Sequence, residues 1–175
     1  DELTQLLNRY ALREDFPTFI NKHLCVALID IDYFKSYNDH YGHSKGDEVL
    51  TVFSQDLKKV FNEDHEIGYR YGGDEFLVIA FNEETNIFRT KLYQLSQALA
   101  DHNDLHMSCS IGYYGDFVSQ IETITTLINK ADHYLYEAKH KGVGQIVGSI
   151  PLLDREHKKK IGQNEEKTLD ALTGL

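Results

Sequence analysis

The sequence is poor in several residue types that mark particular classes of protein. Its 175 residues include no tryptophan, two prolines and two cysteines, and the 28 acidic residues outnumber the 18 basic ones. Two cysteines cannot form a disulfide framework, so Cys25 and Cys109, which lie in apolar runs, are expected to be buried thiols. The formal net charge of −10 argues against a general nucleic-acid or anionic-membrane surface, because such surfaces need a basic patch.

Long apolar runs are also absent. No stretch approaches the roughly 18 apolar residues of a membrane helix, and no signal-peptide pattern is present. The hydrophobic share of 41% and the charged share of 26% are typical of a globular domain, and the length fits one domain with a core. We expect a domain without direct membrane contact that works in the cytoplasm, alone or as part of a larger soluble or membrane-anchored sensor protein.

Predicted helices and strands alternate along the first 150 residues. Apolar residues at helical spacing predict helices over residues 3–20, 49–61, 88–99 and 121–138, with a short helix and a turn between residues 30 and 46. Runs rich in branched residues predict strands over residues 24–29, 66–71, 76–81, 105–111 and 145–147. This order predicts an α/β (α+β) fold of the ferredoxin-like or palm βαββαβ type, with a mixed central sheet flanked by helices.

The remaining residues differ in composition. Residues 151–175 are charged and weakly apolar, which favours a C-terminal linker or loose helix outside the domain of residues 1–150. The segment 170–175 also repeats the pattern of residues 1–6. The repeat is either a coincidence or a sign that a further, similar domain follows in a longer protein.

Two carboxylates follow the first predicted strand. Asp30 and Asp32 flank Ile31 at its carboxyl end, where ligands gather in open α/β sheets. A carboxylate there can hold a metal ion while the amides of the next helix face phosphate. We favour a metal-binding role for Asp30 and a helix-capping role for Asp32.

A second acidic group occupies a predicted hairpin. Gly72 and Gly73 separate two strand-like runs, and two glycines that can both take positive φ are typical of a tight hairpin that a large ligand can approach closely. Asp74 and Glu75 follow directly, and adjacent carboxylates are costly to crowd together unless a cation joins them. Mg²⁺, or Mn²⁺, suits such oxygen ligands and bridges to phosphates. The alternative is a solvated acidic hairpin.

Polar residues after the first strand suit a nucleotide, although taken alone they are ordinary polar residues of a loop and a helix. Lys35 is near enough in sequence to reach a phosphate. Asn38 and Asp47 suit guanine, because a carboxylate accepts hydrogen bonds from the ring N1–H and the exocyclic amine, and adenine has no N1–H. Lys139, near the end of the last long helix, is either a phosphate contact or a complement to the helix dipole.

In order, these motifs strongly resemble the GGDEF family of diguanylate cyclases. The resemblance covers the chain from Asp1 to about Val147. It rests on the ordered segments Asp1-Glu2-Leu3-Thr4, Asp30-Ile31-Asp32-Tyr33-Phe34-Lys35, Arg70-Tyr71-Gly72-Gly73-Asp74-Glu75-Phe76, Ser110-Ile111-Gly112 and Tyr136-Glu137-Ala138-Lys139. It implies a nucleotide-cyclase-like fold that condenses two GTP into cyclic di-GMP and two pyrophosphate, as a transient face-to-face homodimer with Mg²⁺.

The resemblance also implies roles for individual residues. Asp30 and Asp74 would bind Mg²⁺, with the Ile31 carbonyl and Glu75 as further ligands, and Asp74 is the candidate base for the attacking 3′-hydroxyl. The implied catalytic residues are Asp74, Glu75 and Lys35. The implied substrate-binding residues are Asn38, His43, Asp47, Gly72, Gly73 and Lys139.

The chain departs from the family pattern at two places. Glu63 and Glu66 stand where the family often has the Arg-x-x-Asp of an inhibitory product site, so we predict that this site is absent. Val143 stands where an arginine commonly follows a glycine, which removes one phosphate contact that Lys141 would have to replace. The second departure favours the alternative function, a degenerate GTP-binding regulatory module with little turnover.

Overall fold

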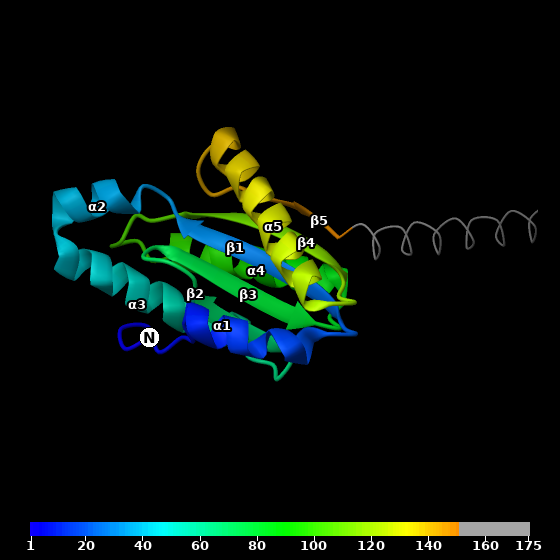
Figure 1. The fold of residues 1–175 in the computed structure, drawn as a ribbon. Helices are drawn as coiled ribbons and strands as arrows, with labels where there is room; N and C mark the ends of the chain where they lie inside the picture. Colours follow the sequence, from blue (N-terminus) through cyan, green and yellow to red (C-terminus); the bar gives the residue numbers. More distant parts are fainter. Residues whose placement is uncertain (151–175) are drawn as a thin grey trace, which may run out of the picture.

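The computed structural model describes residues 1–150. Figure 1 shows a sheet with helices on both sides. The elements, in chain order, are α1 (Arg9–Asp15), the 3₁₀ helix η1 (Phe16–Phe19), β1 (His23–Ile31), α2 (Phe34–Tyr41), α3 (His43–Val60), β2 (Glu66–Arg70), β3 (Glu75–Phe81), α4 (Thr85–Ala100), β4 (Cys109–Phe117), α5 (Ile121–Lys141) and β5 (Ile146–Ser149).

The five strands form one mixed sheet in the order β2-β3-β1-β4-β5. Neighbours are antiparallel except for β4 and β5, which are parallel. The order β4-β1-β3-β2 within it is that of a βαββαβ ferredoxin-like fold, so the predicted fold class is confirmed. The β2–β3 hairpin gives one of the three antiparallel pairs, and the parallel β4–β5 pair makes the sheet mixed.

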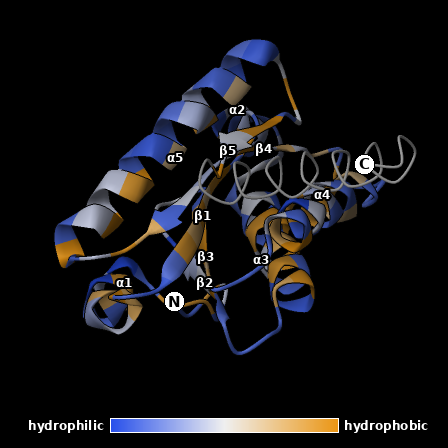
Figure 2. Cartoon of the chain, turned by 90° about the vertical axis from the view of Figure 1, so that its right-hand side faces the viewer, coloured by the Kyte–Doolittle hydropathy of each residue, from blue (hydrophilic) through white to orange (hydrophobic). Residues whose placement is uncertain are grey.

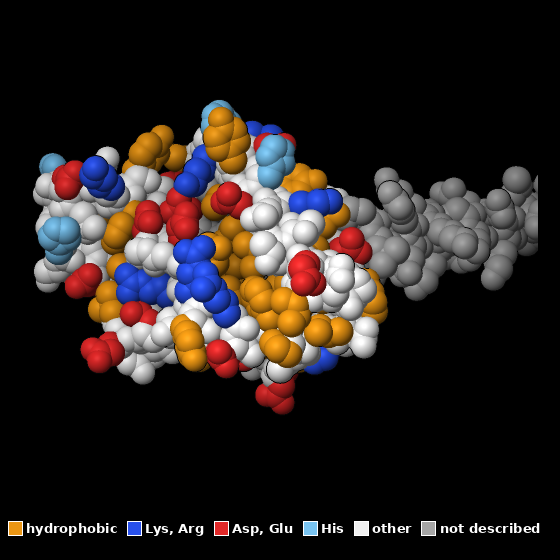
Figure 3. All heavy atoms as spheres, viewed as in Figure 1, with side chains coloured by type: hydrophobic (Ala, Val, Ile, Leu, Met, Phe, Trp, Pro, Cys, Tyr) orange, Lys and Arg blue, Asp and Glu red, His pale blue; other side chains and the backbone are white. Residues whose placement is uncertain are grey.

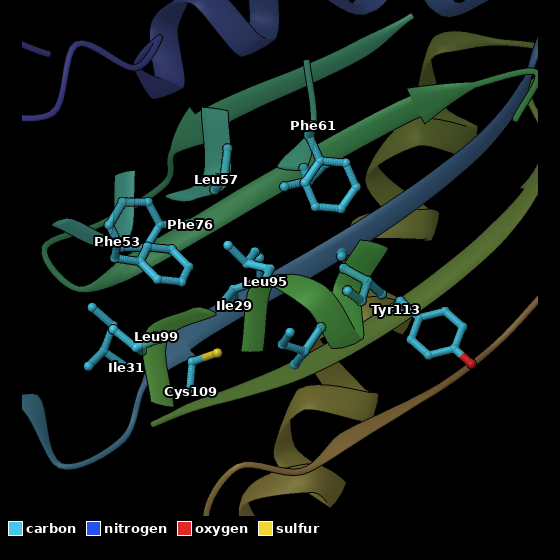
Figure 4. Packing of buried hydrophobic residues seen from close by; sticks show 14 of the residues in the cluster. Ile29, Ile31, Phe53, Leu57, Phe61, Phe76, Leu95, Leu99, Cys109 and Tyr113 are labelled. Carbon is cyan, nitrogen blue, oxygen red and sulfur yellow. The ribbon is translucent and has the colours of Figure 1, made fainter. Parts of the chain in front are cut away.

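Helices cover both faces of the sheet, α1 and α5 on one side and α3 and α4 on the other (Figure 2). The alternation of β1 side chains divides the core accordingly. Cys25, Ala27 and Ile29 pack in the cluster with α3 and α4, whereas Leu24 and Val26 pack with α1 and α5. Figure 4 shows the first cluster, in which the rings of Phe53 and Phe76 meet with centroids 4.6 Å apart.

The first predicted helix is wrong in its early part. The helix begins at Arg9, after Asn8, whose side-chain oxygen accepts a hydrogen bond from the Ala11 amide at 2.9 Å. Leu6 packs in the cluster with α3 and α4, whereas Leu12 packs in the cluster with α5. These two leucines lie on opposite sides of the sheet, so they cannot form the apolar face of one amphipathic helix, although their spacing in the sequence is helical.

The fourth strand also differs from its prediction, since it spans Cys109–Phe117 rather than residues 105–111. Glycine interrupts the apolar run at Gly112, but the strand continues, paired with β1 as far as Phe117, and α5 crosses it at this glycine. A Cβ at this position would lie 2.0 Å from the Leu135 amide nitrogen. Glycine therefore permits the close approach of α5 to the sheet.

Other expectations concern cysteines and membranes. Cys25 and Cys109 are free and buried, as predicted, and burial raises the pKa of each thiol to about 12. Between residues 1 and 150, no helix combines the length and apolar character needed to cross a bilayer. The predicted tail over residues 151–175, with its repeat at 170–175, lies outside the described residues.

Candidate active site

A pocket of about 390 Å³ lies at the carboxyl end of β1. The end of β1, the start of α2, the β2–β3 hairpin and the end of α5 build it. Its lining residues are Asp30, Ile31, Asp32, Tyr33, Phe34, Lys35, Ser36, Asp74, Lys139, Gly142 and Val143. In Figure 3, acidic side chains gather between the ends of α2 and α5, with basic side chains beside them.

Asp30 is a buried carboxylate at the wall of this pocket. Lys139 donates a hydrogen bond to its Oδ2, while its Oδ1 is buried without a hydrogen-bond partner in the described part of the chain. Burial raises the pKa of Asp30 to about 6, despite the opposing effect of Lys139 and with a further increase from Asp74. Asp30 therefore offers one oxygen, still without a partner, to a cation.

Glu75 lies directly across from Asp30 in the pairing of β1 with β3. Burial alone would lower the pKa of Lys139, but the hydrogen bond that Lys139 donates to Asp30 and the nearby charges of Glu75 and Asp74 raise it. Within residues 1–150, however, Asp30, Asp74 and Glu75 are not drawn together as three ligands around one point. A metal ion there would need the Ile31 carbonyl or substrate oxygens as well, which is how Mg²⁺ is commonly held.

The hairpin is held in place by Arg70. Its guanidinium donates to the Gly73 carbonyl at 2.8 Å and to the Asp1 carboxylate at 3.0 Å. The N-terminal turn is thereby connected to the acidic hairpin. Sequence reasoning gave Arg70 no role of its own, although it lies beside the glycine pair in the sequence.

The predicted backbone of the glycine pair is wrong, because neither Gly72 nor Gly73 takes a positive φ. The connection between β2 and β3 spans residues 71–74, so it does not need the left-handed geometry of a two-residue turn. The Gly72 amide donates to the Glu75 carbonyl at 3.1 Å. A Cβ on Gly73 would meet no atom within 4 Å, which leaves this side of the hairpin open to a ligand.

Asp32 has a structural role that the sequence did not reveal. Its carboxylate accepts hydrogen bonds from the Ser108 and Ser110 hydroxyls at 2.5 Å and from the Gly144 amide at 2.9 Å. The predicted capping role is wrong, since Tyr33 occupies the N-cap of α2 and no side chain caps this helix. Asp32 instead joins the starts of β4 and β5 to the pocket wall.

The entry to α2 brings a helix N-terminus to the pocket. Tyr33 has a φ of 54°, an uncommon left-handed conformation for a residue with a side chain, and the helix begins directly after it. Lys35 and Ser36 in the first turn line the pocket. The free amides and positive dipole end of a helix attract phosphate, and exposed Lys35 adds a charge.

The predicted guanine-reading residues lie outside the pocket lining. Asn38 is in α2, and exposed His43 and Asp47 are in the first turns of α3. The Asn38 Oδ1 atom is buried without a hydrogen-bond partner among the described residues, and a Cβ on Gly46 would lie 1.6 Å from it. The structure therefore places the Asn38 side chain tightly against α3 at Gly46, the residue before Asp47.

The two departures from the family pattern lie in different places. Val143 lines the pocket and is 53% exposed, while exposed Lys141 is not among the lining residues. Exposed Glu63 and buried Glu66 lie at the start of β2, where the Glu63 amide donates to the Glu66 carboxylate at 3.1 Å. Lys91 of α4 donates to the same carboxylate at 2.6 Å, so the negative charge of Glu66 is balanced inside the domain.

Comparison with known proteins gives a consistent result. Residues 1–145 match the family model described as "Diguanylate cyclase, GGDEF domain". The diguanylate cyclase VdcA of Vibrio cholerae is 34% identical over 156 residues, which cover 84% of this chain and 46% of the relative. The probable diguanylate cyclase DgcF of Escherichia coli K12 is 36% identical over 155 residues, or 81% and 49% of the two chains. The chain thus spans about half the length of these relatives.

Solved structures show the same architecture. The active GGEEF domain of a diguanylate cyclase from Vibrio cholerae superimposes with a TM-score of 0.73 at 30% identity, covering 82% of this chain and 97% of that one. The coiled coil and GGDEF domain of DgcB from Caulobacter crescentus, in complex with c-di-GMP, gives a TM-score of 0.77 at 24% identity, covering 85% and 84%. The second likeness supports the fold alone.

Proposed function

Since this chain belongs to the GGDEF domain family, we propose that it is a diguanylate cyclase that condenses two GTP into cyclic di-GMP and two pyrophosphate. One observation carries the proposal. The buried Asp30 carboxylate has an oxygen without a hydrogen-bond partner among residues 1–150 and lies in a pocket with Asp74, Lys139 and the N-terminus of α2. These groups suit a triphosphate with its metal ion.

Magnesium fits the oxygen ligands of this pocket, and Mn²⁺ would fit them similarly. Asp30 and Asp74 would hold it, with the Ile31 carbonyl and Glu75 as further oxygen ligands. When bound, the ion would lower the pKa of the attacking 3′-hydroxyl and neutralise the charge that develops on the phosphate. Asp74 is the residue proposed to accept the proton of that hydroxyl.

The lysines supply positive charge for the triphosphate. Lys139 donates a hydrogen bond to the Asp30 carboxylate. Arrival of a metal ion at Asp30 would weaken this ion pair, because the ion competes for the same carboxylate, and would leave Lys139 available for phosphate. Lys35 and the first-turn amides of α2 would bind phosphate oxygens on the other side of the pocket.

Guanine recognition is assigned to Asn38 and Asp47. The Asp47 carboxylate would accept hydrogen bonds from guanine N1–H and the exocyclic amine, which adenine cannot reproduce. Asn38, whose Oδ1 has no hydrogen-bond partner among the described residues, would supply a further contact to guanine. His43, exposed at the start of α3, would contact the substrate beside them.

Turnover requires two copies of the domain. Each would hold one GTP, and the 3′-hydroxyl of one nucleotide would attack the α-phosphorus of the other as pyrophosphate leaves. We therefore propose a transient, face-to-face homodimer. We also propose that cyclic di-GMP has no inhibitory site at Glu63 and Glu66, because carboxylates repel an anionic product and one of them is already bonded to Lys91.

A second candidate is a GTP-binding regulatory module with little turnover. Val143 favours it, because an exposed valine lines the pocket where a cation would contact phosphate. Both functions predict GTP binding, and they differ in product formation. Incubation with GTP and Mg²⁺, followed by chromatographic detection of cyclic dinucleotide, separates them, with Asp74→Asn as the control for metal-dependent turnover.

A further inference from the structure

A second group of potential metal ligands lies at the other end of the β2–β3 hairpin from the acidic connection. His65 precedes β2, Glu66 begins it, and Glu83 follows β3 by two residues. In the described part of the chain, one potential ligand atom from each of the three side chains lies within 4.8 Å of the others. The proposed catalysis uses none of these residues as a metal ligand.

The burial of Glu83 is the second observation that points to a ligand. This side chain is 6% exposed, and its Oε1 lies 3.1 Å from the Nε2 of His65. Its Oε2 is buried without a hydrogen-bond partner among residues 1–150. A buried carboxylate oxygen without a partner is costly unless a cation or donor joins it.

We propose that His65, Glu66 and Glu83 form a binding site for a divalent transition-metal ion, with zinc as the best fit. One imidazole nitrogen and two carboxylate oxygens are a ligand set that Zn²⁺ accepts, with water in the fourth position. Imidazole distinguishes this site from the pocket at Asp30, whose oxygen ligands suit Mg²⁺. The site would join the start of β2 to the end of β3.

Lys91 of α4 acts as the competing cation. Its Nζ lies 2.6 and 2.7 Å from the two carboxylate oxygens of Glu66 and 3.9 Å from Oε1 of Glu83. The Lys91 side chain is 17% exposed, so it has a route toward solvent. Zinc would displace this ammonium from Glu66, because two cations cannot share the carboxylate pair without strong repulsion.

Calorimetric titration of the full chain with Zn²⁺, in excess Mg²⁺ and without nucleotide, tests the proposal. We expect one zinc ion bound with micromolar affinity, and at least a tenfold loss of affinity in His65→Ala and in Glu83→Gln. His102→Ala is the matched control, since the His102 Nε2 lies 2.9 Å from Asp56 but the described residues supply no third ligand there. Because His65 is partly exposed, its variant should fold even if Glu83→Gln does not.

Lys91→Met gives an independent readout of opposite sign. Removing the competing cation should tighten zinc binding at least tenfold while lowering the melting temperature of the zinc-free protein. No zinc uptake, or uptake unchanged in His65→Ala, would overturn the proposal. Uptake lost in Asp74→Asn but kept in His65→Ala would overturn it too, because the ion would then occupy the pocket at Asp30. None of these readouts depends on cyclase activity.

Discussion

Replacing Gly46 with alanine should weaken GTP binding without destabilising the domain. A Cβ at this position would lie 1.6 Å from Oδ1 and 2.7 Å from Cγ of Asn38, so the Asn38 side chain must move. The displaced group is the end of a flexible side chain on α2, and it can turn toward water. The proposed guanine contact would be lost, while the packing of α3 on the sheet would remain.

The two effects have opposite signs. Glycine inside a helix costs about 0.5–1 kcal/mol relative to alanine, so the substitution should leave stability unchanged or raise it slightly. Loss of one hydrogen bond from Asn38 costs about 1–1.5 kcal/mol, which corresponds to a roughly 5- to 12-fold weaker affinity for GTP. A substitution that only damaged the fold would instead lower both the stability and the affinity for GTP.

Thermal unfolding and calorimetric GTP titration measure these quantities on the same preparation. Ser44→Ala, in the first turn of α3, controls for the change in helix propensity and should bind GTP normally. Asn38→Ala should lose about as much affinity as Gly46→Ala, and the double variant should lose little more, because both remove the same contact. Wild-type GTP affinity in Gly46→Ala would refute this view of Asn38.

Three further predictions concern metal binding and nucleotide specificity. Asp30→Ala and Asp74→Ala should each lower turnover by at least about 100-fold in a folded protein, and near-normal rates would remove the metal assignment. Asp47→Ser should relax the preference for GTP over ATP, as paired rate measurements would show, since a hydroxyl can donate as well as accept. Apparent Mg²⁺ affinity should rise from pH 5 and level off above about pH 7. The pKa of Asp30 is raised to about 6, and its protonated form cannot bind the ion. A Mg²⁺ affinity that does not change with pH would contradict this.

The predicted absence of an inhibitory product site can also be tested. Cyclic di-GMP binding should disappear in the presence of a saturating non-hydrolysable GTP analogue. Without a separate product site, cyclic di-GMP can bind only in the active site, which the analogue occupies. Micromolar binding that survives the analogue and is lost on mutation of Glu63 would contradict the prediction. Calorimetric titration distinguishes the two outcomes.

The sheet could be predicted because its strands carry their own signals. β1 is buried on both faces, so its apolar run is unbroken, and the acidic residues at its end mark the pocket. The start of the first helix was harder to predict, since Leu6 and Leu12 have helical spacing but pack on opposite sides of the sheet. Spacing describes positions along the chain and does not reveal which side of the sheet each residue meets.

The site was predictable in its residue types and less so in its contacts. Asp30 and Asp32 both lie at the end of the same predicted strand, yet Asp32 accepts three hydrogen bonds from distant residues, whereas one oxygen of Asp30 has no hydrogen-bond partner in the described part of the chain. Those partners lie 76 to 112 residues away, so no local pattern indicates them. The cluster around Glu83 was missed for the same reason, because β2, β3 and α4 bring its members together.

The most direct test of the account is cyclic di-GMP formation from GTP and Mg²⁺ as a function of protein concentration. A diguanylate cyclase that acts as a transient homodimer should form the cyclic dinucleotide, and its activity per protein molecule should rise with concentration before levelling off. Tight GTP binding with no cyclic dinucleotide at any protein concentration would contradict the account and identify the chain as a binding module.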